Sequence, residues 1–164
     1  MKPSYSNINL TTGHYAGGIY KIKIAPKEWL AFPITPNFSS GKVIDEVLLQ
    51  DGKEFIELEC APDTYEFDEK PKSNRGGSYF EITIQGTVNN VTPELLATLE
   101  TLRYHEVVAI LYDKRRRLKV VGNEYAGLVF RYSNKEDSTK QGGLQICAID
   151  LTMDSDKASP FYVI

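Results

Sequence analysis

The feature that most constrains the fold is a clean alternation of apolar and polar side chains in residues 79–88. Phe80, Ile82 and Ile84 alternate with polar residues in this run. Because successive side chains of a β-strand point to opposite faces, the pattern predicts a strand with one face on a core and the other in water. Residues 56–60 alternate in the same way. The chain is therefore expected to build at least one half-buried sheet.

Further strand-like runs follow one another along the chain. Residues 106–112 are apolar on both sides of the alternation, which is typical of a central strand that is covered on two faces. Residues 118–121 are predicted to pair back on this strand through the charged turn 113–117. The other strand candidates outside the predicted hairpin below are residues 18–24, 128–132 and 144–153.

One segment has the period of a helix. Leucines recur at i, i+4 and i+7 from Leu95, so they form one apolar stripe. Thr92 can cap the N-terminus of a helix, and Pro93 suits its first position. The pattern predicts a single helix over about residues 93–103, packed against the sheet.

Turn residues separate the predicted strands. Asp51-Gly52 readily adopts a tight turn, which predicts a hairpin between residues 42–50 and 54–60. Residues 62–77 and 133–143 are rich in polar residues and glycine, and they are predicted to be long loops.

Length and composition agree with a β-rich domain. The 164 residues favour one domain, and 10 Tyr and 7 Phe against one Trp and two Met favour strand surfaces. Residues 1–15 are polar without a sustained period and are predicted to be a flexible N-terminal arm, followed by one domain over residues 16–164. The predicted fold class is mainly β (α+β), as an antiparallel β-sandwich or partly closed barrel with one flanking helix.

Charge and hydropathy restrict the partners. The net charge of -3 gives no overall attraction to nucleic acid or to an anionic membrane, so neither is expected as a partner. No run approaches the roughly 20 apolar residues of a membrane-spanning helix. Residues 1–6 do not resemble the start of a secretory signal, so a reducing bacterial cytoplasm is the expected place of synthesis.

The reactive side chains are few and scattered. The two histidines, His14 and His105, and the two cysteines, Cys60 and Cys147, do not have the spacing of a metal-binding cluster. Neither a phosphate-binding glycine loop nor the glycine-flanked serine of a nucleophile elbow occurs. No catalytic site, cofactor or metal is expected, and both cysteines are predicted to be buried thiols.

An acidic cluster in the predicted loop 62–77 supports the weakest functional hypothesis, an enzyme. The cluster consists of Asp63, Glu66, Asp68 and Glu69. Paired carboxylates can perform acid–base chemistry, but the cluster lacks the glycine of a calcium loop. A solvated polar loop is the simpler interpretation.

The strongest charged feature is the run Lys114, Arg115, Arg116 and Arg117, with Lys119 just beyond. Arginine side chains can grip phosphates, so this turn is a candidate contact for an anion or nucleic acid. No aromatic residues interleave with it, as base-stacking platforms would require. The simpler alternatives are a solvated turn or a contact between subunits.

The order of features over residues 103–164 resembles tail and virion structural proteins of bacteriophages and prophages. An apolar strand at residues 105–113 is followed by a basic turn, a returning strand at 127–132, a polar loop and a last strand at 144–151. The resemblance implies a β-sandwich or partly closed barrel with one helix, as in tail-tube-like proteins, which assemble as rings and have no catalytic site. The proline-rich residues 26–36 depart from a simple tube protein and leave open a tail-completion or baseplate role.

The favoured hypothesis is therefore a non-enzymatic tail subunit whose partners are copies of itself and other tail proteins, and whose place after assembly is the virion tail. Extended loops and sheet edges suit contacts across subunits, and tyrosine suits interfaces. The alternative is a small nucleic-acid-binding module that uses residues 114–117.

Overall fold

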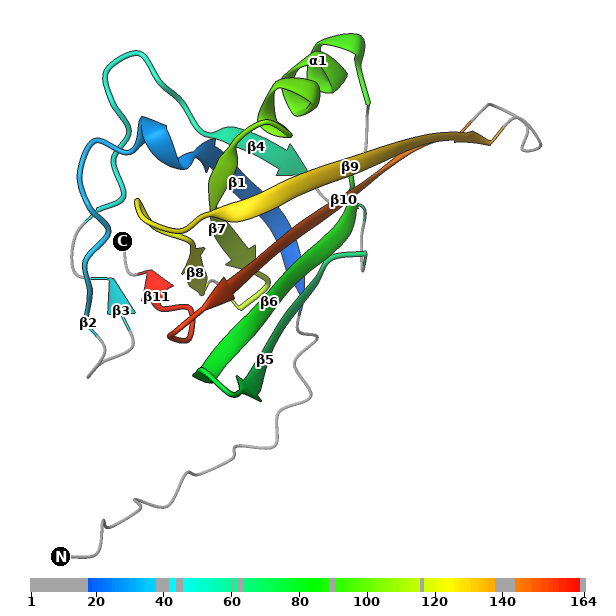
Figure 1. Ribbon diagram of the computed structural model, residues 1–164. Coiled ribbons are helices and arrows are strands. Elements are labelled where there is room, and N and C mark those ends of the chain that lie inside the picture. Colours follow the sequence, from blue (N-terminus) through cyan, green and yellow to red (C-terminus); the bar gives the residue numbers. More distant parts are fainter. Residues whose placement is uncertain are drawn as a thin grey trace, which may run out of the picture.

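The computed structural model describes residues 18–37, 42–43, 46–59, 61, 64–88, 91–115, 117–137 and 144–162. These residues form eleven strands, one α-helix and one 3-10 turn, shown in chain order in Figure 1. The elements are β1 (Ile19–Pro26), η1 (Lys27–Trp29), β2 (Pro36–Asn37), β3 (Lys42–Val43), β4 (Ile56–Glu59), β5 (Glu66–Asn74), β6 (Gly77–Val88), α1 (Pro93–Leu102), β7 (Glu106–Asp113), β8 (Leu118–Val121), β9 (Leu128–Asp137), β10 (Leu144–Ser155) and β11 (Phe161–Tyr162).

All strands belong to one hydrogen-bonded sheet that does not close on itself. Nine of them follow the path β2-β3-β11-β8-β7-β9-β10-β6-β5, and β1 and β4 branch from β7. The C-terminal half of β7 pairs with β8, whereas its first two residues pair with β9. Every pair is antiparallel except the short contact between β3 and β11. The branch at β7 lets one sheet form two layers.

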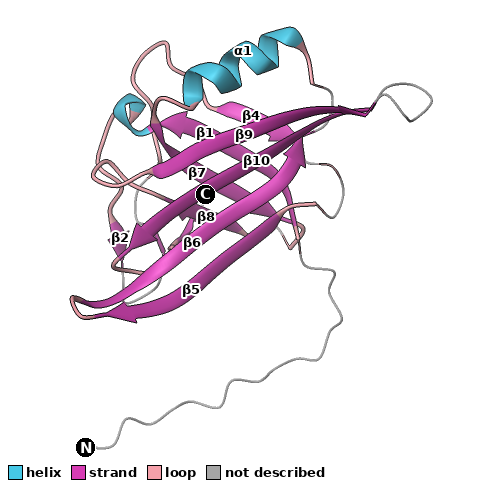
Figure 2. Cartoon of the chain, turned by 45° about the vertical axis from the view of Figure 1, so that its right-hand side comes forward, coloured by secondary structure: helices cyan, strands magenta, loops and turns pink. Residues whose placement is uncertain are grey.

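The larger core lies between these layers. Ile22 and Ile24 of β1 share a buried cluster with Ile84 of β6, Phe130 of β9 and Leu151 of β10. In Figure 2, β5, β6, β9 and β10 pass across β1 and β7, which matches the two layers that the buried side chains join. Apolar burial on both inner faces is the main favourable term that holds the layers together.

Strand β7 is covered on both faces, as its sequence predicts. Val107, Ala109 and Leu111 belong to the larger core. Val108 and Ile110 belong to a second buried cluster, which the segment after β1 covers with Leu30, Ile34 and Val47. The doubly apolar pattern therefore identified the central strand.

Helix α1 confirms the predicted helix. The Thr92 hydroxyl accepts a hydrogen bond from the backbone N–H of Leu95 at 3.2 Å, and Pro93 occupies the first turn. Leu99 and Leu102 are fully buried against the larger core. The mainly β fold with one short helix is thus confirmed. In the part of the chain that the structure describes, no helix is long and apolar enough to cross a membrane.

The prediction of a long loop over residues 62–77 is wrong for most of that segment. Residues 66–74 form β5, which pairs antiparallel with β6 through nine residue pairs. Loop-like residues are tolerated here because β5 is the end of the sheet path, where a proline such as Pro71 costs no ladder hydrogen bond on its open side. Residues 62 and 63 lie outside the described residues.

Two other boundary predictions are also corrected. Residues 133–137, predicted as loop, continue β9 and pair with β10, while 138–143 lie outside the described residues. A turn does occur at Asp51-Gly52, but the hairpin around it does not, because β4 pairs with β1 instead. The predicted arm, residues 1–15, is likewise outside the described part of the chain.

Candidate functional site

The basic turn between β7 and β8 is organised by one carboxylate, Asp113. Its Oδ1 accepts hydrogen bonds from the backbone N–H groups of Arg115 and Arg117, both at 2.8 Å. Its Oδ2 accepts a third from Nε of Arg117, also at 2.8 Å. The backbone N–H of Lys114 donates to the carbonyl of Gly18 at 3.0 Å, which ties the turn to the start of β1. Hydrogen bonds therefore hold the basic turn in a defined conformation.

The charge of Asp113 is stabilised within this turn. Partial burial of the carboxylate opposes its charged form, but the hydrogen bonds from the Arg117 backbone and side chain, the Arg117 charge and the Arg115 N–H outweigh it. The pKa of Asp113 is consequently lowered below its usual value. Asp113 thus stays ionised at neutral pH and neutralises part of the basic turn.

Lys119 reaches from β8 toward β5 on the facing edge. Its Nζ lies 3.7 Å from Oε2 of Glu69, whose Oε1 accepts a hydrogen bond from the Ser159 N–H at 2.7 Å. The same Nζ lies 4.4 Å from the ring centroid of Phe67 and 5.4 Å from that of Phe161. A cation over an aromatic face is attracted by the ring quadrupole. Lys119 therefore links the paired strands β8 and β11 to β5 through side-chain contacts alone.

Aromatic side chains do accompany the basic run, which the sequence did not reveal. The Cζ atom of Arg117 lies 5.7 Å from the ring centroid of Phe161, and Phe67 covers Lys119. Both rings come from strands that are distant along the chain. No local signal could have identified them, because β11 reaches β8 by strand pairing and β5 faces β8 only through the three-dimensional arrangement of the sheet.

A groove lies between β5 on one side and β8 and β11 on the other, and we call it the seam. Its volume is about 390 Å³. Apolar side chains from four strands line it, namely Ile19, Phe67, Leu111 and Phe161, and Arg117 and Lys119 add charge. The seam is the place where β5 faces β8 and β11 through side chains only. It can accept an apolar or aromatic group next to two cations.

The five basic residues singled out in the sequence thus have different surroundings. Arg117 and Lys119 are engaged with carboxylates and aromatic rings, as described above. Lys114 and Arg115 are exposed on the turn, and Arg116 lies outside the described residues. Because two of the cations are already neutralised by acids, the turn offers less charge to a phosphate backbone than its sequence suggests.

The acidic cluster does not form one site. Asp68 pairs with Lys70, whereas Glu69 points to the opposite face of β5 and is only 15% exposed. Glu66 is exposed, and Asp63 lies outside the described residues. Strand alternation therefore separates carboxylates that a loop could have gathered. In the described ranges, no three His, Cys, Asp or Glu side chains are grouped to hold a metal ion.

The two rare residue types behave as packing or surface groups where they are described. Cys147 is buried, and that burial raises the pKa of its thiol. His105 is partly exposed, with Nδ1 at 3.7 Å from Oε2 of Glu28. Cys60 and His14 lie outside the described residues.

Comparison with known proteins adds no further constraint. No family model, no curated protein and no solved structure matches the chain.

Proposed function

We propose that the protein is a non-enzymatic structural subunit that assembles with copies of itself into a ring or tube, as bacteriophage tail proteins do. The proposal rests on the resemblance of residues 103–164 and on the shape of the folded chain. Its partners are other copies and other tail proteins.

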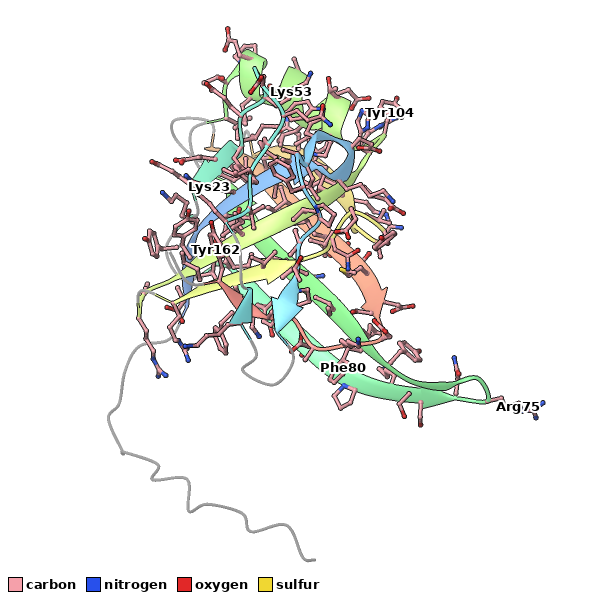
Figure 3. The ribbon with its side chains drawn as sticks, turned by 90° about the vertical axis from the view of Figure 1, so that its left-hand side faces the viewer. Lys23, Lys53, Arg75, Phe80, Tyr104 and Tyr162 are labelled. Atoms are coloured by element: carbon pink, nitrogen blue, oxygen red, sulfur yellow. The ribbon has the colours of Figure 1, made fainter. Side chains whose placement is uncertain are left out.

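The observation that carries the proposal is the hairpin of β5 and β6. Residues 70–78 are all exposed, so the outer part of the hairpin receives no support from either core. Figure 3 shows Arg75 at the tip, far from the body of the molecule, and Phe80 nearer to it. A two-stranded hairpin is marginally stable by itself in water. A projecting arm of this kind is well suited to gain its packing from a neighbouring copy.

A second hairpin and the open edges support the same function. Strands β9 and β10 extend beyond the body of the molecule in Figure 1, on another side from the β5–β6 hairpin. β5 and β4 each pair on one side only among the described strands. Exposed edges of a sheet are templates for pairing with another chain. Arms and edges on several sides suit a subunit with more than one neighbour.

The proposal is tested by shortening the arm. Residues 73–78 are replaced by Asn-Gly, which closes the hairpin between the paired residues Lys72 and Tyr79 with a favoured two-residue turn. We expect the assembled fraction, measured by light scattering at several concentrations, to fall sharply while the circular dichroism spectrum of the fold is retained. Replacing Asp51-Gly52 by Asn-Gly, an exposed turn elsewhere, is the matched control. Equal assembly of the shortened protein and the wild type would count against the arm as a contact.

A further inference from the structure

The loop between β8 and β9 presents one tyrosine to solvent. Tyr125 is 83% exposed, the highest value among the exposed large apolar side chains of the described residues. Its backbone lies in a short loop that begins at Gly122, directly after β8. An exposed aromatic ring is ordinary on a flexible loop, but this loop is fixed in place.

Hydrogen bonds within the loop hold its shape. Oδ1 of Asn123 accepts from the backbone N–H groups of Tyr125 and Ala126, both at 2.9 Å. The N–H of Asn123 donates to the carbonyl of Ala126 at 2.8 Å. Gly122 has φ of +90°, and a Cβ there would lie 3.2 Å from the carbonyl of Val107. The start of the loop therefore packs directly on β7.

Neighbouring segments anchor the loop from outside. Nζ of Lys27 donates to the carbonyl of Tyr125 at 3.3 Å, and the same ammonium pairs with Glu106. The N–H of Ile34 donates to Oε2 of Glu124 at 3.1 Å. The backbone under Tyr125 is thus ordered before any partner binds. A rigid aromatic side chain loses little conformational entropy on binding, which is the property of an interface anchor.

The seam has the chemistry and the size to receive such an anchor. Its volume of about 390 Å³ exceeds the roughly 150 Å³ that suffices for benzene. Ile19 and Phe67 offer apolar contact, and Arg117 and Lys119 already lie against aromatic rings there. A further ring could therefore stack beside these cations.

The loop and the seam lie at opposite ends of β7. Gly122 contacts Val107 near the beginning of the strand, whereas Leu111 and Asp113 line the seam near its end. At about 3.3 Å per residue, the six steps from 107 to 113 separate the two features by about 20 Å. Tyr125 is too far from the seam of its own chain to fill it. The match is therefore between two copies, head to tail.

The charges of the two surfaces are complementary. At the loop, Lys27 pairs with Glu106, and the carboxylate of Glu124 adds a negative charge directly beside Tyr125. Beside the seam, the turn 113–117 has four basic residues against the single carboxylate of Asp113. Opposite charge favours the encounter and orients the two surfaces.

We propose that Tyr125 of one copy inserts into the seam of the next copy and forms the repeating contact of the assembly. The contact uses two different surfaces, so it is heterologous and generates a closed ring or an open tube. The inference rests on the proposed function, because it names the interface through which that self-assembly occurs.

The first test compares two exposed tyrosines. The variant Tyr125→Ala is compared with the control variant Tyr104→Ala. Tyr104 is 71% exposed and lies just after the end of α1. Sedimentation velocity gives the dissociation constant between copies. We expect Tyr125→Ala to raise it about 30-fold or more, as the loss of a central aromatic anchor does, and Tyr104→Ala to leave it within about threefold.

The second test blocks the seam and mixes the variants. Ile19→Trp fills the groove beside Leu111, and Phe161→Glu serves instead if circular dichroism shows that the first variant is not folded. A seam-blocked protein keeps its tyrosine, and Tyr125→Ala keeps its seam. Mixed together, they can form only one contact, so we expect 1:1 dimers and no larger species.

The outcomes separate the two proposals. A wild-type protein that stays monomeric would overturn the proposed function, and the inference with it. A wild type that assembles while Tyr125→Ala assembles equally well would overturn the inference alone. Equal weakening by both tyrosine variants, or large assemblies in the mixture, would also overturn it.

Discussion

Replacing Asp113 by asparagine tests whether one carboxylate shapes the basic turn. In the folded protein this carboxylate accepts three hydrogen bonds, two from backbone N–H groups and one from the guanidinium of Arg117. The side-chain amide of the Asp113→Asn variant is isosteric and keeps one acceptor oxygen for the backbone donors. Its NH₂ group would face Arg117 in place of Oδ2, so one charge-assisted bond is lost and the others weaken.

The expected cost follows from these contacts. A hydrogen bond to a charged group contributes about 1.5–3 kcal/mol. The side chain of Asp113 is 20% exposed and that of Arg117 is 52% exposed, so water competes for the bond and reduces its contribution to the lower end of this range or slightly below it. We expect Asp113→Asn to lower the free energy of unfolding by about 1–2 kcal/mol. For a chain of this length, the melting temperature should fall by about 2–8 °C.

Urea denaturation at several pH values measures this effect. The pKa of Asp113 is lowered in the folded state, so its stabilisation is complete above the unfolded pKa of about 3.9 and is lost as pH falls through the lower folded value. The difference between wild type and variant should be constant from about pH 5 to 8 and shrink below about pH 4. Asp154→Asn, at an exposed position of β10, is the control. Equal unfolding midpoints for Asp113→Asn and wild type at pH 7 would refute the role of Asp113.

Two further substitutions test the fold itself. Thr92→Ala removes the cap of α1, where the hydroxyl binds the Leu95 N–H, and should lower the free energy of unfolding by about 1 kcal/mol in urea titrations; an unchanged midpoint would contradict the cap. Phe130→Ala empties a fully buried site in the larger core and should cost about 3–5 kcal/mol by the same method. A loss below about 1 kcal/mol would mean that Phe130 is not a central core residue.

The parts of the fold that the sequence predicted well are those whose own residues determine their structure. Helix α1 carries its cap, its first-turn proline and its buried stripe within one short segment. β7 is apolar on both sides because both of its faces are buried, so its sequence pattern alone predicts a central strand. Local patterns suffice where burial and hydrogen bonding are set by the same few residues.

Strand β5 could not be predicted because its structure depends on its partner. Its residues are mostly charged, polar or proline, and their composition is that of a loop. Pairing with the strongly alternating β6 supplies the hydrogen bonds, and its edge position tolerates Pro71. The same dependence explains why the carboxylates of Asp68 and Glu69 lie on opposite faces of a strand.

Only part of the candidate site could be predicted from the sequence. The basic run from Lys114 to Arg117 was evident, but its pairing with Asp113 and the rings of Phe67 and Phe161 were not. The bonds to Asp113 depend on the detailed backbone shape of the turn, and the two rings come from strands distant along the chain, so no simple local pattern encodes either. The rigid loop under Tyr125 likewise depends on anchors from Lys27 and other distant residues.

The central claim is that the protein assembles with copies of itself. Sedimentation velocity of the wild-type protein over a wide concentration range, with negative-stain imaging of the heaviest fraction, tests it most directly. The proposal predicts a mass that grows with concentration and rings or tubes of uniform diameter. A single species of 18.5 kDa at every concentration, with no ordered particles, would contradict it.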